Sequence, residues 1–203
     1  MTPGSGAKTH TFLQTLEHMT HDAPEEGLSL SAIFDRLDER AFGAGLFVLA
    51  LPCAIPFLWG IPQIVALPML ALSTQMLAGR HEPWLPEQFA RRRIDQPDLQ
   101  RMARFGRKWF GWLEHVAYPR ASWLAKRPFE RPVALFLTLF CTSILLPIPG
   151  TNSVPGVAVA IVAFGLMARD GLLVLFGMIL GSAWIGLLVF GGSQVIAFFQ
   201  GLL

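Results

Sequence analysis

The sequence predicts an all-α integral membrane protein with two proline-broken helical hairpins, and three observations favour this class. Hydrophobic residues make up 53% of the 203 residues, and the mean hydropathy is +0.48. Two stretches, 41–79 and 132–168, carry no charged residue, and each exceeds the roughly 20 apolar residues of a spanning helix. A third uncharged stretch, 171–190, has the length of one crossing.

The sequence predicts that residues 1–27 form a flexible polar lead and that residues 28–203 form a single membrane domain. The lead holds three histidines and lacks the apolar core of a secretory signal peptide. We therefore expect the chain to insert through its internal hairpins. This places it in an inner or plasma membrane as a multi-pass protein.

The stretch that leads into the first hairpin, 29–40, predicts a short amphipathic helix. Its apolar residues recur at helical spacing, at Leu30, Ile33, Phe34 and Leu37. The charges between them favour a helix on the membrane surface. In the alternative interpretation, Glu39 and Arg40 belong to a site at the mouth of the hairpin.

The first hairpin, 41–79, is predicted to bend between Pro56 and Pro62. Four prolines interrupt it, at Pro52, Pro56, Pro62 and Pro68. Proline removes a backbone donor and clashes with the preceding turn, so a bend is favoured over a straight spanning helix. Gln75 needs a hydrogen-bond partner at membrane depth. It either holds one helix against another or lines a cavity.

The second hairpin, 132–168, matches the first in the spacing of its prolines. Pro149 follows Pro56 by 93 residues, and Pro155 follows Pro62 by the same 93 residues. We interpret the two hairpins as copies of one unit.

The second bend is polar, with Gly150, Thr151 and Asn152. In one interpretation, Asn152 or Ser153 caps the helix that begins near Pro155. In the other, the N-terminus of that helix holds an anionic headgroup, with Arg80 as the counter-charge. The candidate ligand-binding residues are Gln75, Arg80, Asn152, Ser153 and Asp170.

The segment between the hairpins, 80–131, predicts a basic region on the cytoplasmic side. It holds 12 of the 16 lysine and arginine residues, whereas the first 40 residues hold three. Because these residues accumulate on the cytoplasmic side of membranes, we expect the segment to be cytoplasmic. A hairpin returns to its starting side, so the N-terminus is expected there too.

Within this segment, Asp98 to Tyr118 predicts an amphipathic helix, because apolar residues recur every three or four positions. Its basic and aromatic composition favours the membrane interface. The apolar stripe packs either on lipid or on the protein's own helices. Nucleic-acid binding is disfavoured because the flanking segments are membrane segments. The predicted lipid contacts are Arg101, Arg104, Arg107, Lys108 and Trp109.

Residues 171–190 predict a C-terminal transmembrane helix, and Gly191 and Gly192 are expected to break it. Gly177 and Gly181 give this helix a small-residue face. Such a face permits close helix contact, either within the chain or across a dimer. A homodimer is expected because a domain of this size has few internal helices to pack against.

The sequence contains no Gly-rich phosphate loop, nucleophile elbow or metal motif. Its two cysteines, Cys53 and Cys141, lie in apolar arms away from histidine or carboxylate at ligand spacing. They are interpreted as small buried side chains. We therefore predict a protein that is not an enzyme and that uses no metal or cofactor.

Several short motifs follow one another in a fixed order along residues 28–190. They are Leu37–Gly43, Gln75–Arg80, Pro83–Pro86, Leu113–Glu114, Tyr118–Arg120, Pro147–Asn152, Pro155 and Asp170–Gly171. This ordered set resembles the ExoD family of bacterial exopolysaccharide-synthesis membrane proteins. The resemblance implies a bacterial inner-membrane protein linked to exopolysaccharide production.

Two functions are compatible with this resemblance. The first is a non-enzymatic binder or transporter of a lipid-linked saccharide or its polyprenyl-phosphate carrier, similar in outline to DedA-type re-entrant hairpin proteins. The second is an accessory or scaffold protein that organises the synthesis machinery through its basic segment. A transporter should fail when Arg80 or Asn152 is changed, and a scaffold should fail when the face with Arg101, Arg104 and Arg107 is changed.

Overall fold

The computed structural model describes residues 27–56, 60–101, 104, 107–108, 129–146 and 151–200. The prediction of a mostly helical chain is confirmed. Where the sequence predicts a single domain over 28–203, the structure divides into two compact units. One combines residues up to Leu37 with Leu85–Tyr118, and the other combines Asp38–Trp84 with Pro119–Leu203. The predicted flexible lead lies outside the described residues, apart from Gly27.

The first unit contains a short strand pair that corrects the all-α prediction. Strand β1 (Leu28–Ser29) pairs antiparallel with β2 (Arg93–Ile94). Gly27 has a φ of +77° and lies against the Ile94 carbonyl, where a side chain would clash. Two-residue strands carry little sequence pattern, so periodicity gives no signal for this pair.

Helix α2 (Leu30–Leu37) follows β1 directly, and helix α5 (Glu87–Ala90) belongs to the same unit. The Ser29 hydroxyl accepts a hydrogen bond from the Ala32 amide at 3.2 Å, which caps the first turn of α2. Of the predicted apolar stripe, Ile33 and Leu37 are buried. The stripe therefore serves at least in part to pack this unit.

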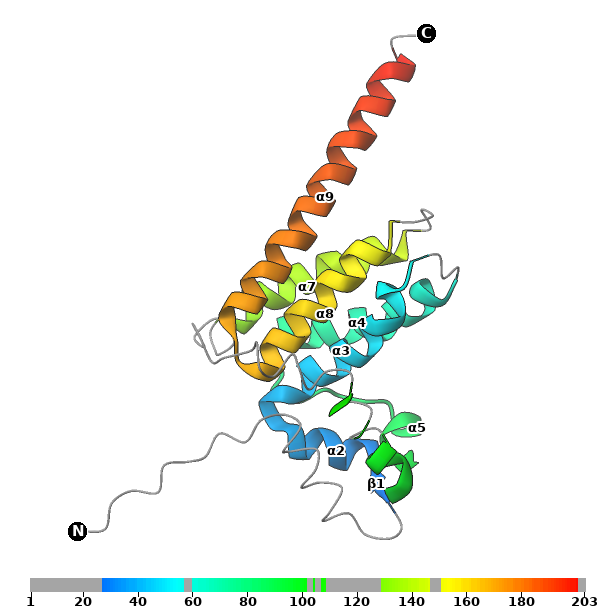
Figure 1. Cartoon of the computed structure of the whole chain (residues 1–203), viewed down its shortest axis with the longest axis vertical. Helices are drawn as coiled ribbons and strands as arrows, with labels where there is room; N and C mark the ends of the chain where they lie inside the picture. Colours follow the sequence, from blue (N-terminus) through cyan, green and yellow to red (C-terminus); the bar gives the residue numbers. More distant parts are fainter. Residues whose placement is uncertain are drawn as a thin grey trace, which may run out of the picture. The chain divides into compact units, whose positions relative to one another are not determined.

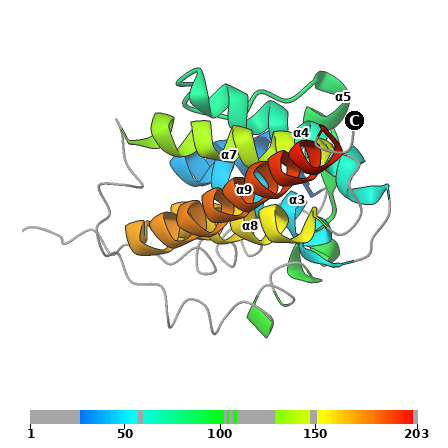
Figure 2. The ribbon, with the colours of Figure 1, turned by 90° about the horizontal axis from the view of Figure 1, so that it is seen from above.

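The structure describes five α-helices in the second unit. These are α3 (Ala41–Ala54), α4 (Ile61–Leu77), α7 (Glu130–Leu145), α8 (Ser153–Ala168) and α9 (Gly171–Gln200). A 3₁₀ turn, η1 (Asp38–Arg40), precedes α3. Helix α3 packs mainly on α8, and α4 packs mainly on α7 (Figures 1 and 2). Each arm of one hairpin thus meets the non-equivalent arm of the other, as expected for two copies related by a twofold rotation.

The first arms of the two hairpins end in the same way. Ile55 and Leu146 adopt extended conformations, with ψ of 122° and 123°. Each precedes a proline, which disfavours helical geometry in the residue before it. In contrast, Pro52 and Pro68 lie inside α3 and α4. These two prolines therefore belong to the helical arms and lie outside the predicted bend between Pro56 and Pro62.

The second arms also end alike, in a Schellman motif. At the end of α4, the Gly79 amide donates to the Met76 carbonyl and the Arg80 amide donates to the Gln75 carbonyl. At the end of α8, the Arg169 and Asp170 amides donate to the Leu166 and Gly165 carbonyls. Gly79 and Arg169 have φ of +79° and +54°. The two hairpins therefore share the geometry of both arm ends.

Both bends lie at one end of this unit. Helices α3 and α8 run antiparallel, because Gly43 lies near Ala163 and Met167 while Cys53 lies near Gly156. Gly79, after α4, lies under the Arg131 guanidinium at the start of α7. We call the end with the bends the bend end and the opposite end, with Arg80, Arg131 and Asp170, the base.

Helix α9 packs on the hairpins through its predicted small-residue face. A Cβ added at Gly177 would lie 3.0 Å from the Ala158 carbonyl oxygen of α8, and one at Gly181 would overlap the Phe140 ring of α7. This face is therefore covered within the chain. The predicted break at Gly191 and Gly192 is wrong, because α9 continues to Gln200.

Among the described helices, one stretch, Gly171–Gly191, is long and apolar enough to cross a membrane. Helices α3, α4 and α8 are apolar but shorter. The buried core lies between the two hairpins and includes Leu46, Met69, Leu137, Phe140 and Val159. Large apolar side chains also cover the outside of this unit, among them Ile64, Leu139 and Ile179.

Candidate functional site

At the bend end, the first turns of α4 and α8 converge on Cys53. The Cys53 thiol lies 3.9 Å from the Pro62 carbonyl oxygen in the first turn of α4. A Cβ added at Gly156, in the first turn of α8, would lie 2.6 Å from the Cys53 carbonyl carbon. Only glycine allows this approach. Two helix N-termini, each carrying partial positive charge and free backbone donors, therefore lie at one end of the unit.

Two buried amide oxygens lie in these same turns. Gln63 Oε1 and Asn152 Oδ1 are inaccessible to solvent, and neither accepts a hydrogen bond from any residue that the structure describes. A buried acceptor without a partner costs about 1–3 kcal/mol. Each oxygen is therefore suited to accept a hydrogen bond from a hydroxyl or amide donor of a ligand. We call Cys53, Pro62, Gln63, Asn152 and Gly156 the bend cluster.

The structure changes the interpretation of Asn152 as a side-chain cap. Asn152 occupies the N-cap position of α8, but its side chain makes no capping hydrogen bond. Its backbone carbonyl accepts from the Gly156 amide at 3.0 Å. Ser153 is the first residue of α8 and is half-buried. The Asn152 side chain thus remains available for another role.

Two residues near the bends were missed by sequence reasoning. Gln63 has the signal that singled out Gln75, an amide in an uncharged apolar stretch. Trp184, on α9, donates from Nε1 to the Thr151 carbonyl at 3.2 Å. A buried indole N–H usually needs a hydrogen-bond partner. The position of Trp184, far from either end of an apolar helix, was therefore the sequence signal that could have identified it.

Arg80 and Asp170 lie at the base, away from Asn152. Asp170 is 3% exposed, and its Oδ1 accepts from the Leu172 amide at 3.0 Å and the Leu173 amide at 3.4 Å. It therefore caps α9, where the helix dipole favours a carboxylate. The 16 residues of α8 separate the base from Asn152, about 24 Å at 1.5 Å per residue. The structure does not bring Arg80 to Asn152 as a counter-charge.

Gln75 holds a loop rather than lining a cavity. Its Oε1 accepts from the Trp84 amide at 2.6 Å, and its Nε2 donates to the Trp84 carbonyl at 3.2 Å. Both polar ends of the side chain are thus used by one backbone residue. This closes the loop that connects Gly79 to Trp84.

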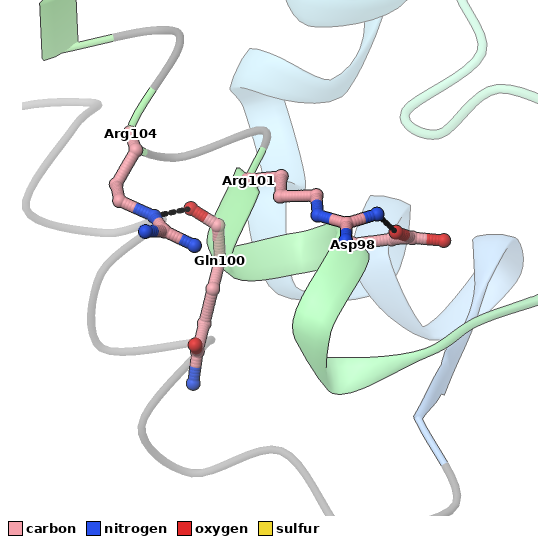
Figure 3. A network of polar contacts seen from close by, with 4 residues as sticks. All are labelled: Asp98, Gln100, Arg101 and Arg104. Carbon is pink, nitrogen blue, oxygen red and sulfur yellow. Dashed lines mark hydrogen bonds and ion pairs between the residues drawn. The ribbon is translucent and has the colours of Figure 1, made fainter.

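The predicted lipid-contact residues belong to the first unit. Residues 96–101, 104 and 107–108 are helical, in agreement with the predicted helix from Asp98. Arg101, Arg104, Arg107 and Lys108 are exposed. Arg101 pairs with Asp98 at 3.1 Å, and Arg104 Nε donates to the Gln100 carbonyl at 3.3 Å (Figure 3). Trp109 lies outside the described residues.

No group of three or more His, Cys, Asp or Glu residues in the described ranges is arranged to hold a metal ion. Cys53 and Cys141 are free thiols, and both are buried. Their interpretation as small buried side chains agrees with this burial.

Comparisons with known proteins give one family. The profile described as "Exopolysaccharide synthesis, ExoD" matches residues 12–190. An uncharacterized protein of Synechocystis sp. is 32% identical over 86% of this chain and 82% of its own. The protein named "Protein ExoD" of Rhizobium meliloti is 25% identical over 85% of this chain and 73% of its own. No solved structure shows a significant match.

Proposed function

This chain belongs to the ExoD family of exopolysaccharide-synthesis proteins, and we propose that it is a non-enzymatic membrane binder or transporter of a lipid-linked saccharide or its polyprenyl-phosphate carrier. Family membership places the chain in exopolysaccharide synthesis. The bend cluster is the ligand site of this proposal. The multi-pass arrangement in the bacterial inner membrane, with the N-terminus and 80–131 in the cytoplasm, is part of it.

The observation that carries this proposal is the convergence of two helix N-termini beside two unpaired amide oxygens. A helix N-terminus binds phosphate through free backbone amides and the helix dipole. Amide oxygens accept hydrogen bonds from sugar hydroxyls. The two hairpins carry no charged residue between 41 and 79 or between 132 and 168. Backbone dipoles are thus the positive groups that the described bend cluster offers to a phosphate.

Native mass spectrometry with an added polyprenyl-phosphate-linked sugar, whose hydroxyls can donate to the two amide oxygens, tests this proposal. We expect Asn152→Ala and Gln63→Ala each to weaken retention of the lipid about tenfold, because one lost hydrogen bond of about 1.4 kcal/mol corresponds to that factor. Arg80→Ala is the matched control, since Arg80 lies at the base, and it should retain the lipid. Wild-type retention in both bend variants at normal expression would contradict the proposal.

The alternative, a scaffold of the synthesis machinery, is favoured by the exposed cations of the first unit. Arg101, Arg104, Arg107 and Lys108 present positive charge at helical spacing, and such charge steers association with an acidic partner. The triple variant Arg101→Gln, Arg104→Gln, Arg107→Gln should then abolish exopolysaccharide production, while Asn152→Ala should not. The binder proposal requires the reverse result.

The homodimer remains a prediction without a proposed interface. The small-residue face that favoured it is covered by α7 and α8 in the chain. A partner copy would therefore need a different surface.

A further inference from the structure

The length of helix α9 can be compared with the distance of the second bend from the base. The hydrogen bond from Trp184 Nε1 to the Thr151 carbonyl fixes the level of α9 that lies beside that bend. Trp184 follows Gly171 by 13 residues on α9, about 20 Å at 1.5 Å per residue. The 16 residues of α8 run from the bend back to the base, which gives about 24 Å. Thr151, at the end of this bend, therefore lies roughly 20–24 Å from the base.

The apolar span of α9 is longer than this distance. Gly171–Gly191 contains 21 residues, about 31 Å at 1.5 Å per residue, close to the 30 Å of a bilayer's hydrocarbon core. Helix α9 passes the second bend and continues beyond it (Figure 1). If the base lies at one interface, Thr151 lies about 6–10 Å before the other.

The surface of the second unit fits this placement. Exposed apolar side chains occur along the whole span of α9, at Leu172, Ile179, Leu187 and Val189. Large apolar patches of this kind mark contact with a membrane or a partner. Residues 41–79, 132–168 and 171–203 contain no charged residue. The charged residues that flank these stretches, such as Arg80, Arg131 and Asp170, lie at the base. This asymmetry favours lipid over a protein partner.

The first bend is at the same level as the second. Its neighbour Cys53 lies against Gly156, in the first turn of α8. The equivalent residues Ile55 and Leu146 end the first arms of the two hairpins, and both are exposed. They are therefore suitable reporters for the two bends.

We propose that the described residues at both bends, Ile55 and Thr151, lie inside the bilayer, that α9 is the helix of the described chain that crosses it, and that the C-terminal end of α9 lies on the side opposite the base. The two hairpins then enter from one face, as parallel repeats related by an axis along the membrane normal. This inference rests on the membrane placement in the proposed function but not on ligand binding.

Depth-dependent fluorescence quenching tests the position of the bends. Single cysteines at Ile55, Leu146, Leu172, Ile179 and Leu187 carry a bimane label in the full chain, reconstituted in phosphatidylcholine vesicles. The parent chain is the blank, because Cys53 and Cys141 are buried. Quenchers are attached either at mid-chain or in the headgroup of the lipid.

We expect labels at Ile55 and Leu146 to match the label at Leu187, which lies 16 residues from Gly171, about 24 Å. They should be quenched more by the mid-chain quencher than by the headgroup quencher, whereas Leu172 should show the opposite order. Bend labels that behave like Leu172 would place the bends at an interface and overturn the proposal. An Ile179 label that no lipid quencher reaches would overturn the membrane placement itself.

An impermeant thiol reagent on oriented vesicles tests the crossing. Glu82→Cys, in the loop at the base, and Gly191→Cys should react from opposite faces. Reaction of both from the same face would refute the crossing by α9. If the depths hold but the polyprenyl-phosphate-linked sugar does not bind, the ligand proposal fails and this inference stands.

Discussion

Replacing Gly156 with alanine tests the close approach of α8 to α3 that holds the bend cluster together. The new Cβ would lie 2.6 Å, 2.7 Å and 2.8 Å from the carbonyl carbon, carbonyl oxygen and Cβ of Cys53. Carbon atoms in favourable contact lie about 3.5–4.0 Å apart. Two of these neighbours are backbone atoms, so relief requires a shift of α8 relative to α3 rather than a rotamer change.

The magnitude follows from two opposing effects. Overpacking a well-packed contact costs about 1–3 kcal/mol, and backbone neighbours favour the upper end. Alanine recovers up to about 1 kcal/mol of helix propensity relative to glycine. We therefore expect Gly156→Ala to lower the free energy of unfolding by about 2 kcal/mol, which changes the ratio of folded to unfolded protein by about 30-fold.

Reversible unfolding in a denaturing detergent, followed by circular dichroism, measures this change. Gly186→Ala is the matched control, because no atom lies within 4 Å of its added Cβ, and it should be neutral or slightly stabilising. Gly43→Ala should be intermediate, since its added Cβ would lie 2.9 Å from the Ala163 carbonyl oxygen and 3.0 Å from the Met167 side chain, both farther than the Cys53 atoms are from a Cβ at Gly156. If Gly156→Ala unfolds at the same detergent concentration as Gly186→Ala, the argument from backbone contact is refuted.

Three further substitutions have expected outcomes. Asp170→Ala removes the cap of α9 and should lower the free energy of unfolding by about 1–2 kcal/mol. Asp170→Asn keeps an acceptor and should lower it by less. Equal losses in the two variants would contradict the capping role. Gln75→Ala releases the backbone of Trp84, so hydrogen exchange of the Trp84 amide should become faster while exchange in α8 stays unchanged. An unaltered exchange rate at Trp84 would show that the loop closes without this side chain. Trp184→Phe keeps an aromatic ring but removes the donor to the Thr151 carbonyl and should cost about 1 kcal/mol; unchanged stability in the same detergent titration would argue against this hydrogen bond.

Several features of the fold depend on residues close together in sequence, and these could be predicted. The bends at Pro56–Pro62 and Pro147–Pro155 follow from the conformation that proline imposes on itself and on the residue before it. The matched ends of the second arms follow the repeat that the proline spacing suggested. The ordered motifs also identified the family, because each is a short string of residues that can be recognised without a fold.

The candidate site required contacts between distant residues. Arg80 and Asn152 were grouped by chemistry alone, yet they lie at opposite ends of the hairpins because α8 runs antiparallel to α3. Gln75 was ambiguous until its partner, Trp84, was known. Gln63 was overlooked because its importance comes from the burial of its amide oxygen without a hydrogen-bond partner.

By itself, the sequence determined where the helices bend, where charge is absent and which family the chain belongs to. These properties arise from backbone stereochemistry, side-chain polarity and short motifs, all of which are local. Only the tertiary structure decided that the two bends share one end, that α9 covers its small-residue face within the chain, and that β1 pairs with β2 across more than 60 residues. These features depend on which surfaces pack against each other. Packing brings together residues that are far apart in the sequence, and no local sequence pattern shows that they are neighbours.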